Sequence, residues 1–535
     1  MPTLTVHNAD TTIRLETHSG QSVRDILDLT TLRVRAACGG TGTCGACKIH
    51  WLDGPVTPLT TAEYMKLDQD EREEGLRLAC QIRLSGDARV RLDDPAPPSP
   101  WKSMDPDSLG PTFGGLPHLE RHIYGLAIDL GTTHIRLALW DRKAGKRIAT
   151  RMGPNPQAAF GSDVLNRLDA ARLTPGRADH IAALARDAIL HAVHDILARD
   201  VGEVTPMLAE IGQVVVVGNT AIMTLLTGTG IDALAAPENW LHRITYQPAH
   251  WVEWLATWRM PHAEILLPPS VAGFIGCDLL ADCIATRILD DPPGTLLLDI
   301  GTNTEIALWD GESLHVTSVP GGPAFEAAGI PNGMPAEAGA IYRAMASPAS
   351  QGIGCAVIGG GAAIGFCGSG LLDGIAMLVQ TGVLKPSGRF KSPGSDDGHA
   401  LIVGNPRSAI TGCAVDAFQR AKAATAAAQE ELLHKAAMTA RDLKRLVVCG
   451  TFGRHLDIAN AQQVGLLPMI DPQRIETHAD AALNGCEQAL LTDDCGAPFA
   501  ELLSKTFAIN LAMINGYEDR FVNLLRLRPF HPLAD

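Results

Sequence analysis

The chain has 535 residues, of which 46% are hydrophobic and 19% are charged, as in ordinary globular proteins. This length predicts about two to four domains. The formal net charge of −15 leaves no basic surplus to offset phosphates, which argues against nucleic-acid binding. We expect no secretory signal, and the apolar run at 214–228 is too short to span a bilayer. We therefore expect a cytoplasmic protein, in which the twelve cysteines stay reduced, so clustered cysteines indicate metal ligands before disulfides.

The first part of the chain, residues 1–92, contains short alternating stretches typical of β-strands and one expected helix at 22–29, capped by Ser22. A C-x5-C-x2-C loop follows this helix, and a fourth cysteine comes later. The four candidate ligands are Cys38, Cys44, Cys47 and Cys80. Four thiolates complete the coordination of a [2Fe–2S] cluster, and the intervening glycines let backbone N–H groups approach the sulfurs. The alternatives are a structural zinc site, which usually has two C-x2-C pairs rather than one, or unrelated buried cysteines.

Residues 93–122 are rich in proline and lack apolar periodicity, which predicts a semi-extended linker. Longer strands and helices follow, including an amphipathic helix at 178–200. The segment 123–141 recurs at 295–311, each copy having a strand, a D-[IL]-G-T-[TN] turn, a second strand and the sequence L-W-D. This internal repeat predicts two similar lobes. We place the first lobe at 123–230 and the second lobe with the C-terminal domain at 231–535.

Each copy of the repeat carries a turn that can bind phosphate. A glycine lets the backbone approach the phosphate, and threonine hydroxyls and amides donate to it. The candidate residues are Gly131, Thr132, Thr133, Gly301, Thr302, Asn303 and Thr304. Asp129 and Asp299 begin the turns and are expected to hold Mg²⁺ and position water, while Glu305 is a candidate base or a solvated charge. Further glycine-rich turns place Gly321, Gly322, Gly450 and Gly453 beside the nucleotide, and Glu326 is a second candidate base; plain tight turns explain these glycines equally well.

Together these residues resemble the superfamily of acetate and sugar kinases, heat-shock-70 proteins and actin. The order of a ferredoxin module, a Pro-rich linker, D-I-G-T-N-T-E, G-P-A-F-E, C-G-S-G-L-L-D and G-L-L-P resembles more closely the reductive activators of corrinoid proteins, along nearly the whole chain. The resemblance implies an α+β β-grasp ferredoxin domain followed by an α/β two-lobed, actin-like (RNase H-like) nucleotide-binding domain. Thr304 and Thr451 depart from the family pattern, which tends to have glycine there.

The resemblance also implies a function: with ATP and Mg²⁺, one electron passes from the [2Fe–2S] cluster to the Co(II) corrinoid of a methyltransferase-system corrinoid protein and regenerates Co(I). An upstream electron donor is expected, and a homodimer through the first lobe is allowed. Two alternatives stay open: a redox-regulated small-molecule kinase, and a ferredoxin whose nucleotide domain gates docking without turnover. An activator of radical dehydratases is disfavoured, because those proteins carry a [4Fe–4S] cluster at a dimer interface.

Overall fold

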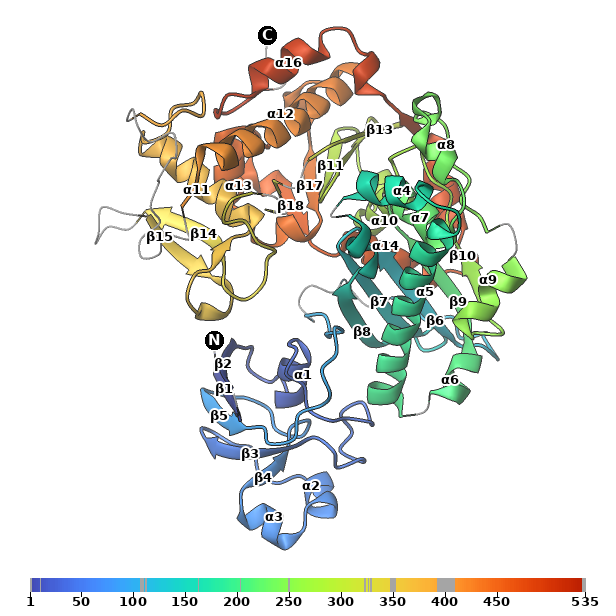
Figure 1. Ribbon diagram of the computed structural model, residues 1–535, viewed down its shortest axis with the longest axis vertical. Coiled ribbons are helices and arrows are strands. Elements are labelled where there is room, and N and C mark those ends of the chain that lie inside the picture. Colours follow the sequence, from blue (N-terminus) through green and yellow to red (C-terminus); the bar gives the residue numbers. More distant parts are fainter. Residues whose placement is uncertain are drawn as a thin grey trace.

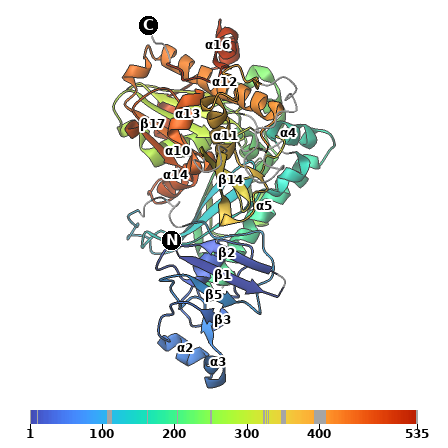
Figure 2. The same cartoon turned by 90° about the vertical axis from the view of Figure 1, so that its left-hand side faces the viewer.

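The computed structural model describes residues 2–9, 11–105, 110, 113–161, 163–202, 204–248, 251–321, 324–325, 327, 330–346, 353–391 and 409–531. Two of the predicted site residues, Gly322 and Glu326, lie outside this set. Figures 1 and 2 show the N-terminal domain at one end of the molecule, below two larger lobes that lie beside each other. Among the described residues, no helix combines the length and apolarity needed to cross a bilayer.

The N-terminal domain is a mixed sheet packed on one helix, which confirms the predicted β-grasp class. Its strand order is β2-β1-β5-β3-β4, with β1 parallel to β5 and antiparallel to β2. The strands are β1 (Thr3–Asn8), β2 (Thr11–Glu16), β3 (Lys48–Asp53), β4 (Leu76–Leu78) and β5 (Ala88–Arg91), and the helices are α1 (Val23–Asp28), α2 (Thr61–Lys66) and α3 (Gln69–Glu73). The side chain of Ser22 caps α1 as predicted, accepting from the Asp25 N–H.

The first lobe is built on a five-stranded sheet of order β10-β9-β6-β7-β8. Its strands are β6 (Tyr124–Leu130), β7 (His134–Asp141), β8 (Lys146–Pro154), β9 (Ile211–Val217) and β10 (Glu264–Leu266). The sequence predicts that this lobe ends at residue 230, but β10 pairs with β9, so the sheet extends past that boundary. Its helices are α4 (Val164–Arg172), α5 (Arg177–Ile196), α6 (Thr205–Glu210), α7 (Thr220–Thr227), α8 (Ile231–Ala235), α9 (Trp251–Trp258) and α10 (Cys277–Thr286).

The second lobe repeats this topology around a sheet of order β18-β17-β11-β12-β13-β19. In both lobes a three-stranded antiparallel meander is extended by a parallel strand: β9 beside β6 in the first, β17 beside β11 in the second. The sequence repeat is therefore a structural repeat. The strands are β11 (Thr295–Ile300), β12 (Thr304–Trp309), β13 (Leu314–Val319), β17 (Arg445–Cys449), β18 (Ile475–His478) and β19 (Thr506–Ala508).

A small third sheet, β15-β14-β16, extends from the second lobe. It consists of β14 (Ala340–Ala346), β15 (Ile353–Val357) and β16 (Gly365–Phe366). The 3-10 turn after β15, at Ile358–Gly360, contacts β2 of the N-terminal domain. The remaining helices are α11 (Gly368–Gln380), α12 (Gly412–Lys435), α13 (Ile458–Val464), α14 (Ala481–Leu490), α15 (Ala497–Lys505) and α16 (Tyr517–Leu524).

Helices α10 and α14 pack closely together between the two large sheets. The two helices approach each other at Gly485, where an added Cβ would lie 1.8 Å from the carbonyl oxygen of Ala281. Only glycine fits at that point, so the sequence encodes a tight helix crossing where the lobes meet.

Part of the predicted linker is packed rather than free. Trp101 and Met104 are 4% and 5% exposed, and Lys102 exchanges backbone hydrogen bonds with Met152 at the edge of β8. The Trp101 ring lies against Gly153, where a Cβ would approach it to 2.5 Å. The segment up to residue 105 is thus attached to the first lobe.

Candidate functional site

The four predicted cluster cysteines lie together on the N-terminal domain. Cys38, Cys44 and Cys47 lie in the loop between α1 and β3, and Cys80 follows β4. Cys47 and Cys80 are buried, whereas Cys38 and Cys44 are partly exposed. The loop needs glycine: Gly42 has φ +82°, and a Cβ there would lie 2.7 Å from that of Ala62.

The cysteines interact as two pairs. The Cys38 side chain interacts with that of Cys44, and the Cys47 side chain with that of Cys80. Smaller electrostatic effects link the pairs, from Cys44 to Cys47 and from Cys38 to Cys80. Among the described residues, no group of three or more His, Cys, Asp or Glu side chains converges on a single metal position. Two pairs of thiols suit a two-iron cluster, in which each iron takes two protein ligands, better than one tetrahedral zinc ion.

The surroundings favour the thiolate at two of the four cysteines, Cys38 and Cys80. Burial opposes ionisation of Cys38, but the N–H groups of Cys44 and Gly42 and the Thr41 hydroxyl outweigh it and lower the Cys38 pKa to about 6. The Cys47 thiol donates to Cys80, which lowers the Cys80 pKa to about 7 against the effect of burial. The same hydrogen bond raises the pKa of Cys47. Donors aimed at sulfur are what an iron–sulfur centre requires.

Two residues that the sequence analysis did not select support Cys80. The Gln81 amide donates to the Cys80 sulfur (3.3 Å) and to the Gly40 carbonyl (3.0 Å), so it links the two ends of the ligand set. The positive charge of Arg24, on α1, contributes a smaller part of the lowered Cys80 pKa.

A polar cleft lies between the two lobes, and it brings both phosphate turns together. The predicted residues that line it are Asp129, Gly131, Thr132, Thr133, Asp299, Gly301, Thr302, Asn303, Glu305 and Gly450. Thr451, one of the two departures from the family pattern, also lines it. The cleft does not include Thr304, Gly321 or Gly453 in its lining. Thr304 is instead fully buried against Gly321, where a Cβ would lie 2.1 Å from its hydroxyl oxygen.

Buried carboxylates crowd the floor of this cleft. Asp278 and Asp282 project from α10 toward Asp299, and the sequence analysis missed both. Burial, followed by the charges of Asp299 and Asp129, raises the pKa of Asp278 to about 8. Burial and neighbouring carboxylates also hold the pKa of Asp282 well above its usual range, and its Oδ2 has no hydrogen-bond partner. Such a set of repelling oxygens is suited to a divalent cation.

Glu305 is not a solvated charge, because it is 4% exposed. It accepts hydrogen bonds from the Asn219 amide (3.1 Å) and the Ser318 hydroxyl (3.2 Å). Burial, together with the charges of Asp278 and Asp299, raises its pKa well above the usual range. The neutral form of the candidate base is therefore favoured relative to an exposed glutamate, and a cation beside its neighbours would favour the carboxylate.

One cation of the protein itself faces these acids. Arg136, opposite Asp129 in the β6–β7 pairing, donates to it at 3.1 Å. Its Nε also lies 3.3 Å from Asp480, without hydrogen-bond geometry. Arg136 is 12% exposed and lines the cleft, so it offers a positive charge beside the phosphate turns.

The fold and these two sites define an iron–sulfur domain joined to a two-lobed nucleotide-binding domain. Comparison with known domain families agrees: residues 6–85 match the 2Fe-2S iron-sulfur cluster binding domain, residues 124–291 the RACo middle region, and residues 294–531 the C-terminal domain of RACo, the ASKHA domain. The chain therefore belongs to the RACo family, which the sequence resemblance had indicated.

Two curated relatives have corrinoid-related names. The chain is 30% identical over 416 residues to the corrinoid activation enzyme RamQ of Eubacterium limosum, covering 70% of this chain and 65% of the relative. It is 28% identical over 382 residues to the [Co(II) methylated amine-specific corrinoid protein] reductase of Methanosarcina barkeri, covering 65% and 66%. The chain thus spans just under two thirds of each relative.

Among solved structures, the chain resembles a reductive activator for corrinoid, iron-sulfur protein. The TM-score is 0.62 at 24% sequence identity, and the match covers 98% of both chains. This likeness extends the shared fold over all the domains described above.

Proposed function

We propose that this protein uses ATP to help one electron pass from its [2Fe–2S] cluster to the Co(II) corrinoid of a partner protein, which regenerates Co(I). The observation that carries the proposal is the joining, in one chain, of a paired-cysteine loop and a cleft with two phosphate turns. The names of both relatives, one a corrinoid activation enzyme and the other a Co(II) corrinoid protein reductase, support it.

We assign the cluster to Cys38, Cys44, Cys47 and Cys80, with one pair of cysteines on each iron. When bound, the cluster supplies a carrier for one electron. The Cys38–Cys44 pair is the more exposed half, so electrons reach and leave the domain most readily on that side.

In the cleft, Asp299, Asp278 and Asp129 are the proposed holders of Mg²⁺, which relieves the repulsion between them. Among the described residues, no three such side chains converge on one metal position, so we propose that these carboxylates hold the cation largely through its bound waters. The backbone and side chains of Thr132, Thr133, Thr302 and Asn303 face the same space and donate to phosphates. Arg136 adds positive charge beside the first turn. Asp129 can serve the cation only if Arg136 shifts from it toward the nucleotide, so we expect this ion pair to change when nucleotide binds.

The need for ATP is energetic. Plant-type [2Fe–2S] clusters have potentials of about −400 mV, and we propose that the Co(II)/Co(I) couple of the partner lies lower. For one electron, each 59 mV of unfavourable difference costs about a factor of ten in equilibrium. A nucleotide that binds both phosphate turns closes the two lobes on each other, and the N-terminal domain contacts both lobes. Nucleotide-driven closure can therefore change how the electron donor and its partner are held.

ATP hydrolysis tests this proposal against its two alternatives. We expect the anaerobic, cluster-loaded protein to release inorganic phosphate from ATP slowly alone and faster with a Co(II) corrinoid protein. Transfer of the phosphate to a small molecule would favour the kinase, and unstimulated background hydrolysis would favour a docking domain without turnover. The upstream electron donor, the homodimer and the cytoplasmic location stay predictions from the sequence.

A further inference from the structure

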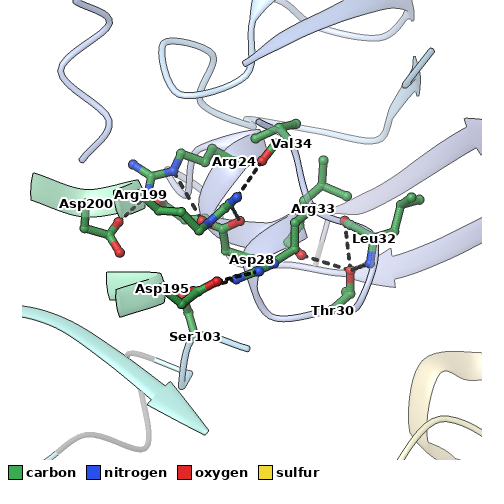
Figure 3. A network of polar contacts seen from close by, with 12 residues as sticks. Arg24, Asp28, Thr30, Leu32, Arg33, Val34, Ser103, Asp195, Arg199 and Asp200 are labelled. Atoms are coloured by element: carbon green, nitrogen blue, oxygen red, sulfur yellow. Dashed lines mark hydrogen bonds and ion pairs between the residues drawn. The ribbon is translucent and has the colours of Figure 1, made fainter. Parts of the chain in front are cut away.

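The N-terminal domain is attached to the first lobe by a buried network of arginines and aspartates (Figure 3). Arg33 binds both carboxylate oxygens of Asp195, at 3.0 and 2.9 Å, and Arg24 pairs with Asp200. In the opposite sense, Arg199 of the lobe pairs with Asp28 at 2.6 Å. The side chains of Arg24 and Arg33 are 4% and 3% exposed.

Arg151 completes the network from within the lobe, donating to Asp195 at 2.5 Å and to Asp200 at 2.6 Å. Buried ion pairs of this kind fix one geometry but add little net stability, because each charge loses its water. The docked position is therefore well defined, and loss of one charge leaves its partner buried without compensation, which destabilises docking.

The same interface covers the cluster loop. The N–H of Gly39 donates to the carbonyl of Arg199 at 3.2 Å. A Cβ on Gly39 would lie 2.4 Å from the Asp200 carbonyl oxygen, and one on Gly202 would lie 2.7 Å from the Ala37 carbonyl oxygen. The two backbones are in direct contact on either side of Cys38, one of the proposed ligands.

Arg24 connects the network to the cluster loop. Its guanidinium Nη1 would lie 3.3 Å from a Cβ on Gly40, and its charge acts on Cys80. The other terminal nitrogen, Nη2, pairs with Asp200. Arg24 also pairs through Nε with Asp28 of its own domain at 3.2 Å, and Asp200 is shared with Arg151 of the lobe. Docking therefore adds one lobe carboxylate, Asp200, to the cation that faces the ligands.

Two more features of the docked position, like the carboxylate beside Arg24, disfavour an added electron on the cluster. Residues 199–202 end the helical segment that begins with α5 and continues through a π-helical turn at Leu197–Val201, so its negative dipole end faces the loop. The Gly39 N–H, a donor in the ligand loop, is taken by the Arg199 carbonyl. The carboxylate beside Arg24, the negative end of the helical segment and the loss of the Gly39 N–H as a donor each make an added electron on the cluster less favourable.

We propose that docking of the N-terminal domain on the first lobe is coupled to the cluster's redox state through Arg24 and Asp200. Docking lowers the reduction potential, and by linkage reduction by a one-electron donor weakens docking by the same factor. In the oxidised state the N-terminal domain is docked on the first lobe. On reduction the added electron stays on the cluster and no covalent bond breaks. The reduced domain undocks and can then approach its electron acceptor.

Small-angle scattering and potentiometry on the full-length, cluster-loaded protein test this coupling without ATP or a corrinoid partner. We expect the radius of gyration to increase when dithionite reduces the wild-type protein. We expect Asp200→Asn to be extended in both states and to have a higher midpoint potential by EPR-monitored titration. If reduction weakens docking tenfold, the undocked potential lies about 59 mV above the docked one.

Two further variants separate the contact from the charge. Gly202→Ala keeps every charge but places a Cβ against Ala37, so it should also undock the domain and raise the potential. Asp187→Asn removes an exposed charge from α5, 13 residues before Asp200 and about 20 Å away along the helix, and should behave as wild type. The proposal is overturned if reduction leaves the wild-type dimensions unchanged or smaller, or if Asp200→Asn and Gly202→Ala both keep the wild-type potential. A variant that fails to fold leaves the wild-type comparison decisive.

Discussion

The crowded carboxylates of the cleft predict that Mg-ATP binding releases a proton. Asp278 is buried beside Asp299 and Asp129, and its pKa is raised to about 8, by burial first and then by those two charges. At neutral pH this carboxyl is therefore mostly protonated before the cation arrives. A cation among the three carboxylates stabilises the charged form, so Mg²⁺ must displace the proton.

The size of the effect follows from the position of this pKa. One pKa unit corresponds to 1.36 kcal/mol, so binding at pH 7 costs about 1.4 kcal/mol more than binding well above pH 8. The affinity for Mg-ATP should therefore rise about tenfold from pH 7 upward and level off above about pH 8. Asp278→Asn carries no proton there, so its weaker binding should lack this part of the pH dependence.

Isothermal titration calorimetry from about pH 6.5 to about pH 9, in buffers of different ionisation enthalpy, measures both the affinity and the protons released. The matched control is Asp232→Asn on α8, whose side chain is 87% exposed and pairs with Arg172 at the surface. This control should keep the wild-type dependence of the Mg-ATP affinity on pH. Equal pH profiles for wild type and Asp278→Asn would refute the assignment of Asp278 to the cation site.

Three further changes test other parts of the structure. Cys80→Ser should abolish the visible absorbance of the [2Fe–2S] cluster, whereas the exposed Cys413→Ser should retain it; equal spectra would contradict the ligand assignment. Gly485→Ala should lower the free energy of unfolding in urea by at least about 1–3 kcal/mol, since its Cβ overlaps the Ala281 carbonyl, while Gly361→Ala, with open space around it, should be nearly neutral. Burial lowers the pKa of Lys422 to about 7, below its unfolded value, so the unfolded chain binds more protons between about pH 7 and pH 10.5 and stability should rise with pH there. Lys422→Met should remove this contribution from the pH profile of the melting temperature; identical slopes would exclude it.

The local sequence was sufficient to predict the site residues wherever a short motif holds those residues together. The cysteine loop needs only its spacing and glycines, and Cys80 joins it through the adjacent β4. The D-x-G-T turns follow strands whose apolar runs are visible in the sequence, so Asp129 and Asp299 could be paired through the internal repeat. Both groups of residues lie together in the structure.

The missed residues depend on packing between distant segments. Asp278 and Asp282 are one helical turn apart on α10, a spacing that marks one face of a helix, but only the position of α10 between the lobes turns that face to the cleft. Similarly, the sequence places Trp101 in a linker, and only the folded structure shows that its ring packs against Gly153, which has no side chain there. The pairing of Arg24 with Asp200 joins positions 176 residues apart, for which a single sequence carries no signal.

We propose above all that the iron–sulfur domain and the nucleotide cleft act together to reduce a corrinoid. The most direct test mixes anaerobically reduced protein with a Co(II) corrinoid protein and follows Co(I) by its absorbance, with and without Mg-ATP. We predict Co(I) only when ATP is present, and none with Cys80→Ser. Co(I) formation that is the same without ATP, or its absence from two proteins that bind each other with the cluster intact, would contradict this account.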